Sequence, residues 1–263
     1  MVLAYAFCNV SVMPVRNEPS HCAEQVTQLL FGEKAEVLEI NNKEWAKIRG
    51  HWDDYEGWCR LSQLSIVNKK EYSKETKYLA ATHTDKILLP SGHMWLPMGS
   101  GLSGLKGGYL KPSGEAGKYK GKKLKVKNVA LTGEAVKNAA LKYMHAPYLW
   151  GGKSIAGIDC SGLSQMAYRL CNHRIQRDAS QQAREGVLVD FLQNAQCGDL
   201  AFFDEKEGKI NHVGILLDSQ HIIHASETSG KVVIDRIDQG GIISTSLKRR
   251  THNLRLVKRM IIK

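Results

Sequence analysis

Hydrophobic and polar residues alternate in short runs through the N-terminal part of the chain. Runs of this kind occupy residues 10–12, 35–40, 45–49 and 57–60, with turns between them. Period two without a helical stripe predicts short strands that form a small barrel. Residues 23–30 are an exception, because their polar content favours a helical turn or an irregular insert. We therefore expect a small all-β domain over residues 1–66.

Glycine and proline divide the next segment, residues 67–127, into short apolar pieces. Examples are residues 88–92, 94–97 and 107–110. This pattern is consistent with a second, degenerate SH3-like barrel. Residues 118–127 are rich in glycine and lysine, and we expect them to form the linker or the last strand of this domain.

Helical periodicity begins in the third segment, residues 128–263. Thr132 is the expected N-cap of a first helix, and Pro147 follows its end. A second apolar stripe starts at Cys160 and predicts another helix. Its members lie three, seven, ten and eleven residues after Cys160: Leu163, Ala167, Leu170 and Cys171. Strands predicted around 200–203, 212–217, 221–225, 232–234 and 254–257 would form an antiparallel sheet against this helix, giving an α+β domain.

Cys160 is a candidate nucleophile because a glycine-containing loop delivers it to the first turn of the predicted helix. Unpaired backbone N–H groups and the positive end of the helix dipole favour a thiolate at this position. We therefore expect the pKa of Cys160 to lie below that of a free thiol. The alternative for an isolated cysteine is a buried core residue.

Two histidines satisfy the need of a nucleophilic thiol for a base and for a group that orients the base. His212 begins one predicted strand, and His224 lies in the next. If residues 218–220 form a hairpin loop, residue 224 lies opposite 214, and 214 shares a face with His212. The two imidazoles are then diagonal neighbours that can touch. For His224, the alternative is a surface or structural histidine at a strand end.

Four motifs together resemble the NlpC/P60 family of cysteine peptidases, which have a papain-like α+β core and hydrolyse bacterial cell-wall peptides. The motifs are Tyr148 to Leu163, Gly198 to Phe203, Asn211 to Ile215 and His224 to Ser226. The resemblance implies that Cys160 is the nucleophile, His212 the general base and acid, and His224 the third member. It also implies that Tyr148 helps to stabilise the oxyanion. Ser164 departs from the family pattern, which more often has an apolar residue there.

The N-terminal segment is similar to the bacterial SH3-type domain of the dipeptidyl-peptidase VI and YkfC-like branch of that family. The similar residues are Ser11 to Arg16, Glu24 to Glu33 and Asp54 to Trp58. This branch cleaves γ-D-glutamyl-L-diamino acid bonds. By matching motifs, Glu24, Tyr55 and Asp159 would hold the free α-amine of an N-terminal L-alanine, and Ser161 and Ser180 would contact the γ-D-glutamyl part.

Ordinary structural roles remain open for three of these residues. Glu24 could be a solvated turn residue and Tyr55 part of the barrel core. Asp159 could be an acid at the helix start that supports the fold, and a carboxylate beside Cys160 works against a thiolate.

The net charge of +11 permits more than one interpretation. Much of the excess lies in residues 106–127, with eight lysines and one acid, and in residues 248–263, with seven basic residues and no acid. A nucleic-acid or membrane surface would have this charge. We favour solvated faces, because no stacking pattern or nucleic-acid motif accompanies the charge. No apolar run is long enough to span a bilayer.

Six cysteines are scattered without a CxxC pair, which favours reduced thiols and makes a zinc site unexpected. We therefore expect no metal and no cofactor. The first residues lack the basic segment of a signal peptide, so we expect a cytoplasmic protein.

Three functions fit these observations. The favoured one is a γ-D-glutamyl-L-diamino acid endopeptidase acting on free murein peptides during peptidoglycan recycling. The second is an exported hydrolase whose SH3-type domains bind intact wall. The third is a binding module with an inactive core, and the intact Cys160, His212 and His224 set argues against it. The sequence leaves the third-position diamino acid and the oligomeric state open.

Overall fold

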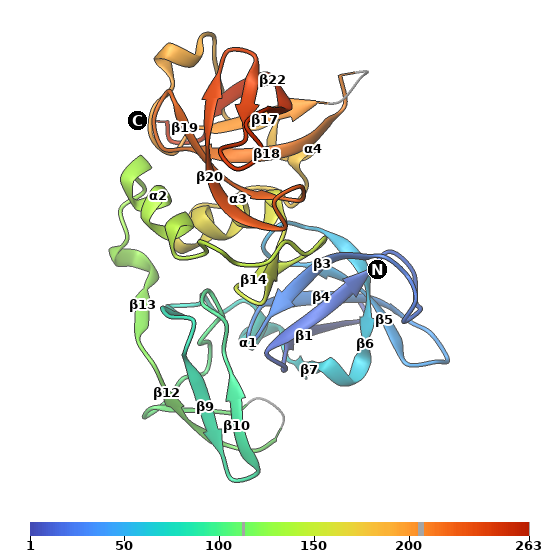
Figure 1. Cartoon of the computed structure of the whole chain (residues 1–263). Helices are drawn as coiled ribbons and strands as arrows, with labels where there is room; N and C mark the ends of the chain where they lie inside the picture. The colour runs from blue at the N-terminus through green and yellow to red at the C-terminus, as the bar shows by residue number, and fades with distance from the viewer. Residues whose placement is uncertain (112–113, 205–207, 263) are drawn as a thin grey trace. The chain divides into compact units, whose positions relative to one another are not determined.

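The computed structural model describes residues 1–111, 114–204 and 208–262. The chain divides into two compact units, Met1–Asn128 (unit 1) and Val129–Lys263 (unit 2). In Figure 1, unit 1 consists mainly of strands, whereas unit 2 combines helices with a sheet. Among the described residues, no helix is both long and apolar enough to cross a membrane.

The first part of unit 1 is a seven-stranded antiparallel sheet in the order β3-β2-β6-β5-β4-β1-β7. Alternate residues of β2 and β4 are buried, as period two requires for a sheet with one buried face. Its core includes Ala6, Met13, Val37 and Ile48. The strands are β1 (Ala4–Cys8), β2 (Val12–Arg16), β3 (Gln25–Leu30), β4 (Lys34–Ile40), β5 (Trp45–Gly50), β6 (Glu56–Arg60) and β7 (Leu64–Val67), with a 3₁₀ turn at Leu61–Gln63 and helix α1 at Lys69–Tyr72.

The expected helical turn over residues 23–30 is wrong, because Gln25–Leu30 forms strand β3. Its partner is β2, with Val12 opposite Leu30 and Pro14 opposite Gln28. Val26 and Thr27 are β-branched and suit a strand, and the polar Thr27 and Gln28 are buried in it. These polar residues therefore lie in the sheet, where their polarity alone predicts a helical turn or an irregular insert.

The second part of unit 1 builds two small sheets around its own core. Gly101 donates a backbone hydrogen bond to Phe31 O at 2.7 Å, and Phe31 belongs to the same apolar cluster as Ile87 and Leu96. The two parts of unit 1 therefore share packing; the assignment of residues 67–127 to a second barrel stays a prediction. The strands are β8 (Tyr78–Ala80), β9 (Lys86–Leu89), β10 (Gly92–Trp95), β11 (Tyr109–Leu110), β12 (Gly117–Lys120) and β13 (Lys123–Lys125), with a 3₁₀ turn at Val126–Asn128.

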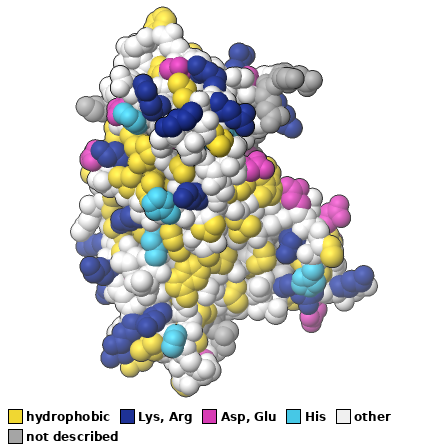
Figure 2. Space-filling view, viewed as in Figure 1, with side chains coloured by type: hydrophobic (Ala, Val, Ile, Leu, Met, Phe, Trp, Pro, Cys, Tyr) yellow, Lys and Arg dark blue, Asp and Glu magenta, His cyan; other side chains and the backbone are white. Residues whose placement is uncertain are grey.

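The lysines of this basic segment occupy the solvent side of its strands. In β12 the exposed Lys118 and Lys120 alternate with buried positions, and Lys123 and Lys125 of β13 are also exposed. On the face shown in Figure 2, Lys and Arg side chains stand in several separate groups.

Unit 2 packs helices against an antiparallel sheet, which confirms the expected α+β architecture. Helix α3 (Cys160–Leu170) is buried along its whole length and packs against β18 and β19 (Figure 1). The sheet order is β16-β22-β17-β18-β19-β20-β21, and an additional pairing of β21 with β22 closes it. The other elements are α2 (Gly133–Leu141), α4 (Ala179–Gln182), a 3₁₀ turn (Leu192–Asn194), β14 (Lys153–Ser154), β15 (Gly157–Ile158), β16 (Val187–Val189), β17 (Leu200–Asp204), β18 (Ile210–Leu216), β19 (His221–Ser226), β20 (Lys231–Asp238), β21 (Gly241–Ile243) and β22 (Arg250–Arg259).

Candidate active site

Cys160 is the first residue of α3, as its sequence position predicts. Asp159 is the N-cap, and its Oδ1 accepts a hydrogen bond from the backbone N–H of Gly162 at 2.7 Å. A side chain at Gly162 would collide with the carbonyl of Gly152, 2.3 Å from its Cβ position, so the close approach of loop and helix requires glycine. Ser164, the departure from the family pattern, is fully buried and donates its hydroxyl to Cys160 O at 3.2 Å. The departure therefore leaves no unsatisfied hydroxyl in the helix.

The histidine pair forms as the hairpin geometry predicts. Ile215 lies opposite Ile223, which places position 214 opposite 224. His212 Nε2 lies 2.8 Å from His224 Nδ1. Gly214 stands between them, and a Cβ there would lie 3.0 Å from the Cβ of His224 and 2.6 Å from Ile222 Cδ1. The absence of a side chain at position 214 therefore lets the two imidazoles meet diagonally across the hairpin.

Two further side chains complete this cluster, and sequence reasoning missed both. Asp235 of β20 lies 3.2 Å from His224, between Oδ2 and Nε2. His252 of β22 stacks on His212 with ring centroids 4.1 Å apart and an angle of 22° between the planes. A signal existed for Asp235, a carboxylate directly after the apolar strand predicted at 232–234; for His252 the long strand β22 offered none.

Burial dominates the charge state of Cys160. Together with the neighbouring Asp159 carboxylate, it raises the pKa of the thiol to about 12. Backbone N–H groups of Val213 and Ser161, and the Arg177 guanidinium, act in the opposite direction but are outweighed. The expected lowering of the pKa of Cys160 is therefore wrong. The N–H of Val213 also places the thiol beside the residue that follows His212.

Burial acts on His212 in the opposite sense. It lowers the pKa of His212 well below 6.5, and the neighbouring His224 and His252 lower it further. These directions favour a neutral thiol at Cys160 and a neutral imidazole at His212 in the free site. Such a pair reacts by general-base removal of the thiol proton and needs no preformed ion pair.

Asp159 already has several partners in the structure. Its carboxylate forms two hydrogen bonds with the buried Arg177, at 3.0 and 2.7 Å, and accepts the N–H of Gly151 at 2.7 Å. Arg177 also donates to Ser161 Oγ at 2.8 Å. These contacts give Asp159 and Ser161 a structural role, and their predicted contacts with substrate stay predictions. Sequence reasoning missed Arg177.

Tyr148 and Ser180 are both half-buried in unit 2. Tyr148 is anchored by its backbone N–H, which donates to Gly230 O at 2.8 Å. Burial raises the pKa of Tyr148, and Cys160 and Asp159 raise it further, so the hydroxyl keeps its proton near the thiol. Such a hydroxyl can donate to an oxyanion. Ser180 lies in the short helix α4. The roles of both residues stay predictions.

Glu24 and Tyr55 lie in unit 1. Glu24 is exposed directly before β3, and its carbonyl accepts the N–H of Asn17 at 3.1 Å. Tyr55 is half-buried directly before β6, and its N–H donates to Asp53 Oδ1 at 3.2 Å. Their predicted contact with the substrate amine stays a prediction.

Comparison with known proteins identifies a family for both the C-terminal and the N-terminal domain. The profile of the NlpC/P60 family matches residues 145–251, and that of the bacterial dipeptidyl-peptidase Sh3 domain matches residues 15–64. A gamma-D-glutamyl-L-lysine dipeptidyl-peptidase of Bacillus subtilis (strain 168) is 30% identical over 233 residues, covering 81% of this chain and 77% of that protein. The chain belongs to the NlpC/P60 family.

Two further relatives agree with this NlpC/P60 assignment. Dipeptidyl-peptidase 6 of Lysinibacillus sphaericus is 28% identical, covering 84% of this chain and 88% of that protein. The crystal structure of an NlpC/P60 family protein from Bacillus cereus ATCC 10987 has the same fold, with a TM-score of 0.78 and 20% sequence identity. The superposition covers 98% of this chain and 99% of the Bacillus cereus chain. The chain is thus a peptidase with an SH3-like N-terminal domain.

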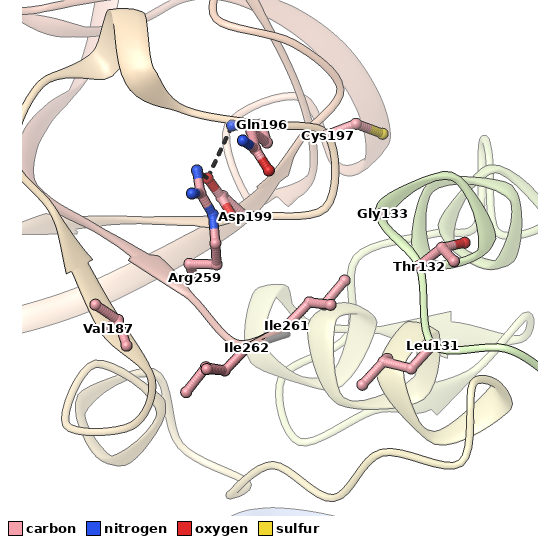
Figure 3. Close-up of a pocket in the computed structure, with 10 residues that line it drawn as sticks. All are labelled: Leu131, Thr132, Gly133, Val187, Gln196, Cys197, Asp199, Arg259, Ile261 and Ile262. Carbon is pink, nitrogen blue, oxygen red and sulfur yellow. Dashed lines mark hydrogen bonds and ion pairs between the residues drawn. The ribbon is translucent and has the colours of Figure 1, made fainter.

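Unit 2 of this NlpC/P60 peptidase also contains a separate cavity of about 610 Å³ (Figure 3). Its wall holds Arg259 and Asp199, which bind each other at 3.0 and 2.8 Å, and includes none of the predicted site residues. Within residues 1–111, 114–204 and 208–262, no group of three or more His, Cys, Asp or Glu side chains is arranged to hold a metal ion.

Proposed function

We propose that this NlpC/P60 peptidase is a cysteine endopeptidase that hydrolyses the γ-D-glutamyl-L-diamino acid bond of murein peptides with a free N-terminal L-alanine. The observation that carries the proposal is the 2.8 Å contact of His212 with His224, together with a thiol at the start of α3 that is hydrogen-bonded by the backbone N–H of Val213, the residue after His212. The names of the relatives, a gamma-D-glutamyl-L-lysine dipeptidyl-peptidase and a dipeptidyl-peptidase 6, support the substrate.

In the proposed reaction, His212 takes the proton of Cys160 as the sulfur attacks the amide carbonyl. His212 Nε2 is engaged with His224, so Nδ1 is the nitrogen that serves the thiol. The backbone N–H of Cys160 and the hydroxyl of Tyr148 donate to the developing oxyanion. His212 then returns its proton to the departing amine, and a thioester of Cys160 remains. Water, activated by neutral His212, hydrolyses this thioester and regenerates the thiol.

Recognition of the substrate amine is part of the same proposal. An ammonium group taken from water is costly unless carboxylate or hydroxyl groups pair with it. Glu24, Tyr55 and Asp159 would supply these acceptors, and Ser161 and Ser180 would contact the γ-D-glutamyl part. Glu24→Gln and Tyr55→Phe should therefore raise KM more than they lower kcat.

The reaction belongs, in this proposal, to recycling of wall fragments in the cytoplasm. A peptide with an unsubstituted N-terminal alanine is a released fragment, whereas intact wall has that amine in an amide bond. Cleavage of purified sacculi with retention on them would instead support the exported hydrolase. Assays on free peptides and on sacculi, combined with cell fractionation, distinguish the recycling enzyme from the exported hydrolase.

The direct test is release of L-Ala-γ-D-Glu from L-Ala-γ-D-Glu-L-Lys and from the diaminopimelate analogue. N-acetylation of the alanine removes the ammonium and should abolish cleavage. Equal rates on acetylated and free peptides would rule out the amine requirement.

A further inference from the structure

A continuous line of hydrogen bonds runs from His212 into the interior of unit 2. His212 Nε2 lies 2.8 Å from His224 Nδ1, and His224 Nε2 lies 3.2 Å from Asp235 Oδ2. The other carboxylate oxygen, Oδ1, accepts the backbone N–H of Thr245 at 2.8 Å. His224 is fully buried and Asp235 is 4% exposed, so bulk water does not compete for these bonds.

The direction of each hydrogen bond follows from its buried end. Burial alone would raise the pKa of Asp235, but bonds from His224 and Thr245 outweigh it and lower the pKa, so the carboxylate is ionised. An ionised carboxylate only accepts, so His224 Nε2 must donate. When His224 is neutral, its single N–H is the one on Nε2, which leaves its Nδ1 as an acceptor. His212 Nε2 therefore donates to it, and the lone pair of His212 is on Nδ1.

We propose that Asp235 is a positioning residue that fixes the tautomers of His224 and, through it, of His212. The proposal rests on the proposed function of the Cys160 site. The same bond directions hold when His212 is an imidazolium, because Nε2 donates to His224 in both states. The proton taken from Cys160 thus always enters and leaves at Nδ1, and neither neighbouring ring has to rearrange during turnover.

Thr245 makes the replacement Asp235→Asn informative. The backbone N–H of Thr245 needs an acceptor, so the amide oxygen of the new side chain turns toward it and the NH₂ group faces His224 Nε2. His224 Nε2 must then accept, and its proton moves to Nδ1. That proton is donated to His212 Nε2, so the neutral His212 has its hydrogen on Nδ1. An imidazole in this tautomer has no lone pair for the thiol.

A matched control lies three residues along the same strand. Asp238 is an exposed carboxylate in an ion pair with Arg250 at 2.6 and 3.0 Å. Asp238→Asn removes the same charge from β20 without touching the histidines. Both variants are assayed for kcat and KM on L-Ala-γ-D-Glu-L-Lys and for unfolding by urea. Imidazole ¹⁵N chemical shifts, which distinguish Nδ1–H from Nε2–H, are measured for His212 and His224 in each protein.

We expect Asp235→Asn to lower kcat by about 10²–10⁴-fold, the upper value being the loss caused by a wrong histidine tautomer in Ser-His-Asp hydrolases. KM should change by less than about threefold, because no substrate contact is lost. The ¹⁵N shifts should move from Nε2–H to Nδ1–H in both histidines, whereas Asp238→Asn should match the unsubstituted protein.

Unchanged kcat, or unchanged ¹⁵N shifts in a folded Asp235→Asn variant, would overturn the proposal. If that variant does not fold, the unsubstituted protein decides: Nε2–H on both neutral rings supports the proposal, and Nδ1–H on either contradicts it. Absence of peptidase activity in the unsubstituted protein would refute the proposed function, while the ¹⁵N shifts would still report the tautomers.

Discussion

Arg177 holds both carboxylate oxygens of Asp159 at the start of α3. The two hydrogen bonds measure 3.0 and 2.7 Å, and both side chains are buried. A buried carboxylate next to Cys160 would otherwise oppose formation of a thiolate and would itself be costly. The ion pair therefore keeps the N-cap of α3 while reducing its electrostatic penalty on the thiol.

We expect Arg177→Met to lower the free energy of unfolding by about 3–5 kcal/mol, because it leaves a buried carboxylate without its partner. Alkylation at Cys160 should also slow, since Arg177 favours the thiolate. Urea unfolding and mass spectrometry of the alkylated Cys160 peptide measure the two effects. Arg255→Met is the control, because Arg255 is exposed and its ion pair with Asp204 spans 3.7 Å. Arg255→Met should lower the free energy of unfolding by less than about 1 kcal/mol. A similar decrease in both variants would contradict the account.

Gly214→Ala should separate the imidazole rings of His212 and His224. The added methyl group would lie 3.0 Å from His224 Cβ and 2.6 Å from Ile222 Cδ1, so the hairpin must shift. We expect kcat to fall by at least about tenfold and stability by about 1–3 kcal/mol, the usual cost of overpacking. Ile222→Val changes packing at the same place without approaching the rings and should retain kcat. A Gly214→Ala variant with full kcat would show that the diagonal contact is not needed.

Stability should fall as the pH is lowered from about 6.5 toward about 4. Burial lowers the pKa of His212 well below 6.5 and that of His252 to about 4. In this window the unfolded chain binds more protons than the folded one, so the free energy of unfolding rises with pH. Urea unfolding at a series of pH values tests the slope. His252→Phe keeps a stacked ring that cannot be protonated, so its free energy of unfolding should depend less steeply on pH. An equal dependence in both proteins would show that His252 does not contribute to it.

The sequence predicted the parts of the site that depend on local geometry. Residues 160–171 have a helical period, and a three-residue loop sets the hairpin register that brings His224 to His212. Both features follow from a few consecutive residues. The prediction of a helical turn at residues 23–30 failed because strand Gln25–Leu30 forms by pairing with β2, and the local polar pattern does not encode that pairing.

The remaining site residues could not be predicted because each arrives from an element whose register the sequence leaves open. Asp235 comes from β20, Arg177 from a loop before α4, and His252 from the closing strand β22. The prediction of a lowered pKa for Cys160 failed for a related reason. Its helix position is readable from the sequence, but the burial that dominates the pKa depends on the folded sheet.

The central claim is that the sulfur of Cys160 attacks the γ-D-glutamyl bond. It is tested most directly by kcat for L-Ala-γ-D-Glu-L-Lys in the unsubstituted protein and in Cys160→Ala, with correct folding verified by circular dichroism. We predict that the variant loses about 10⁴-fold or more, as hydrolases do when the nucleophile is removed. Retention of activity to within about tenfold would contradict the claim, because a nucleophile supplies far more than that factor.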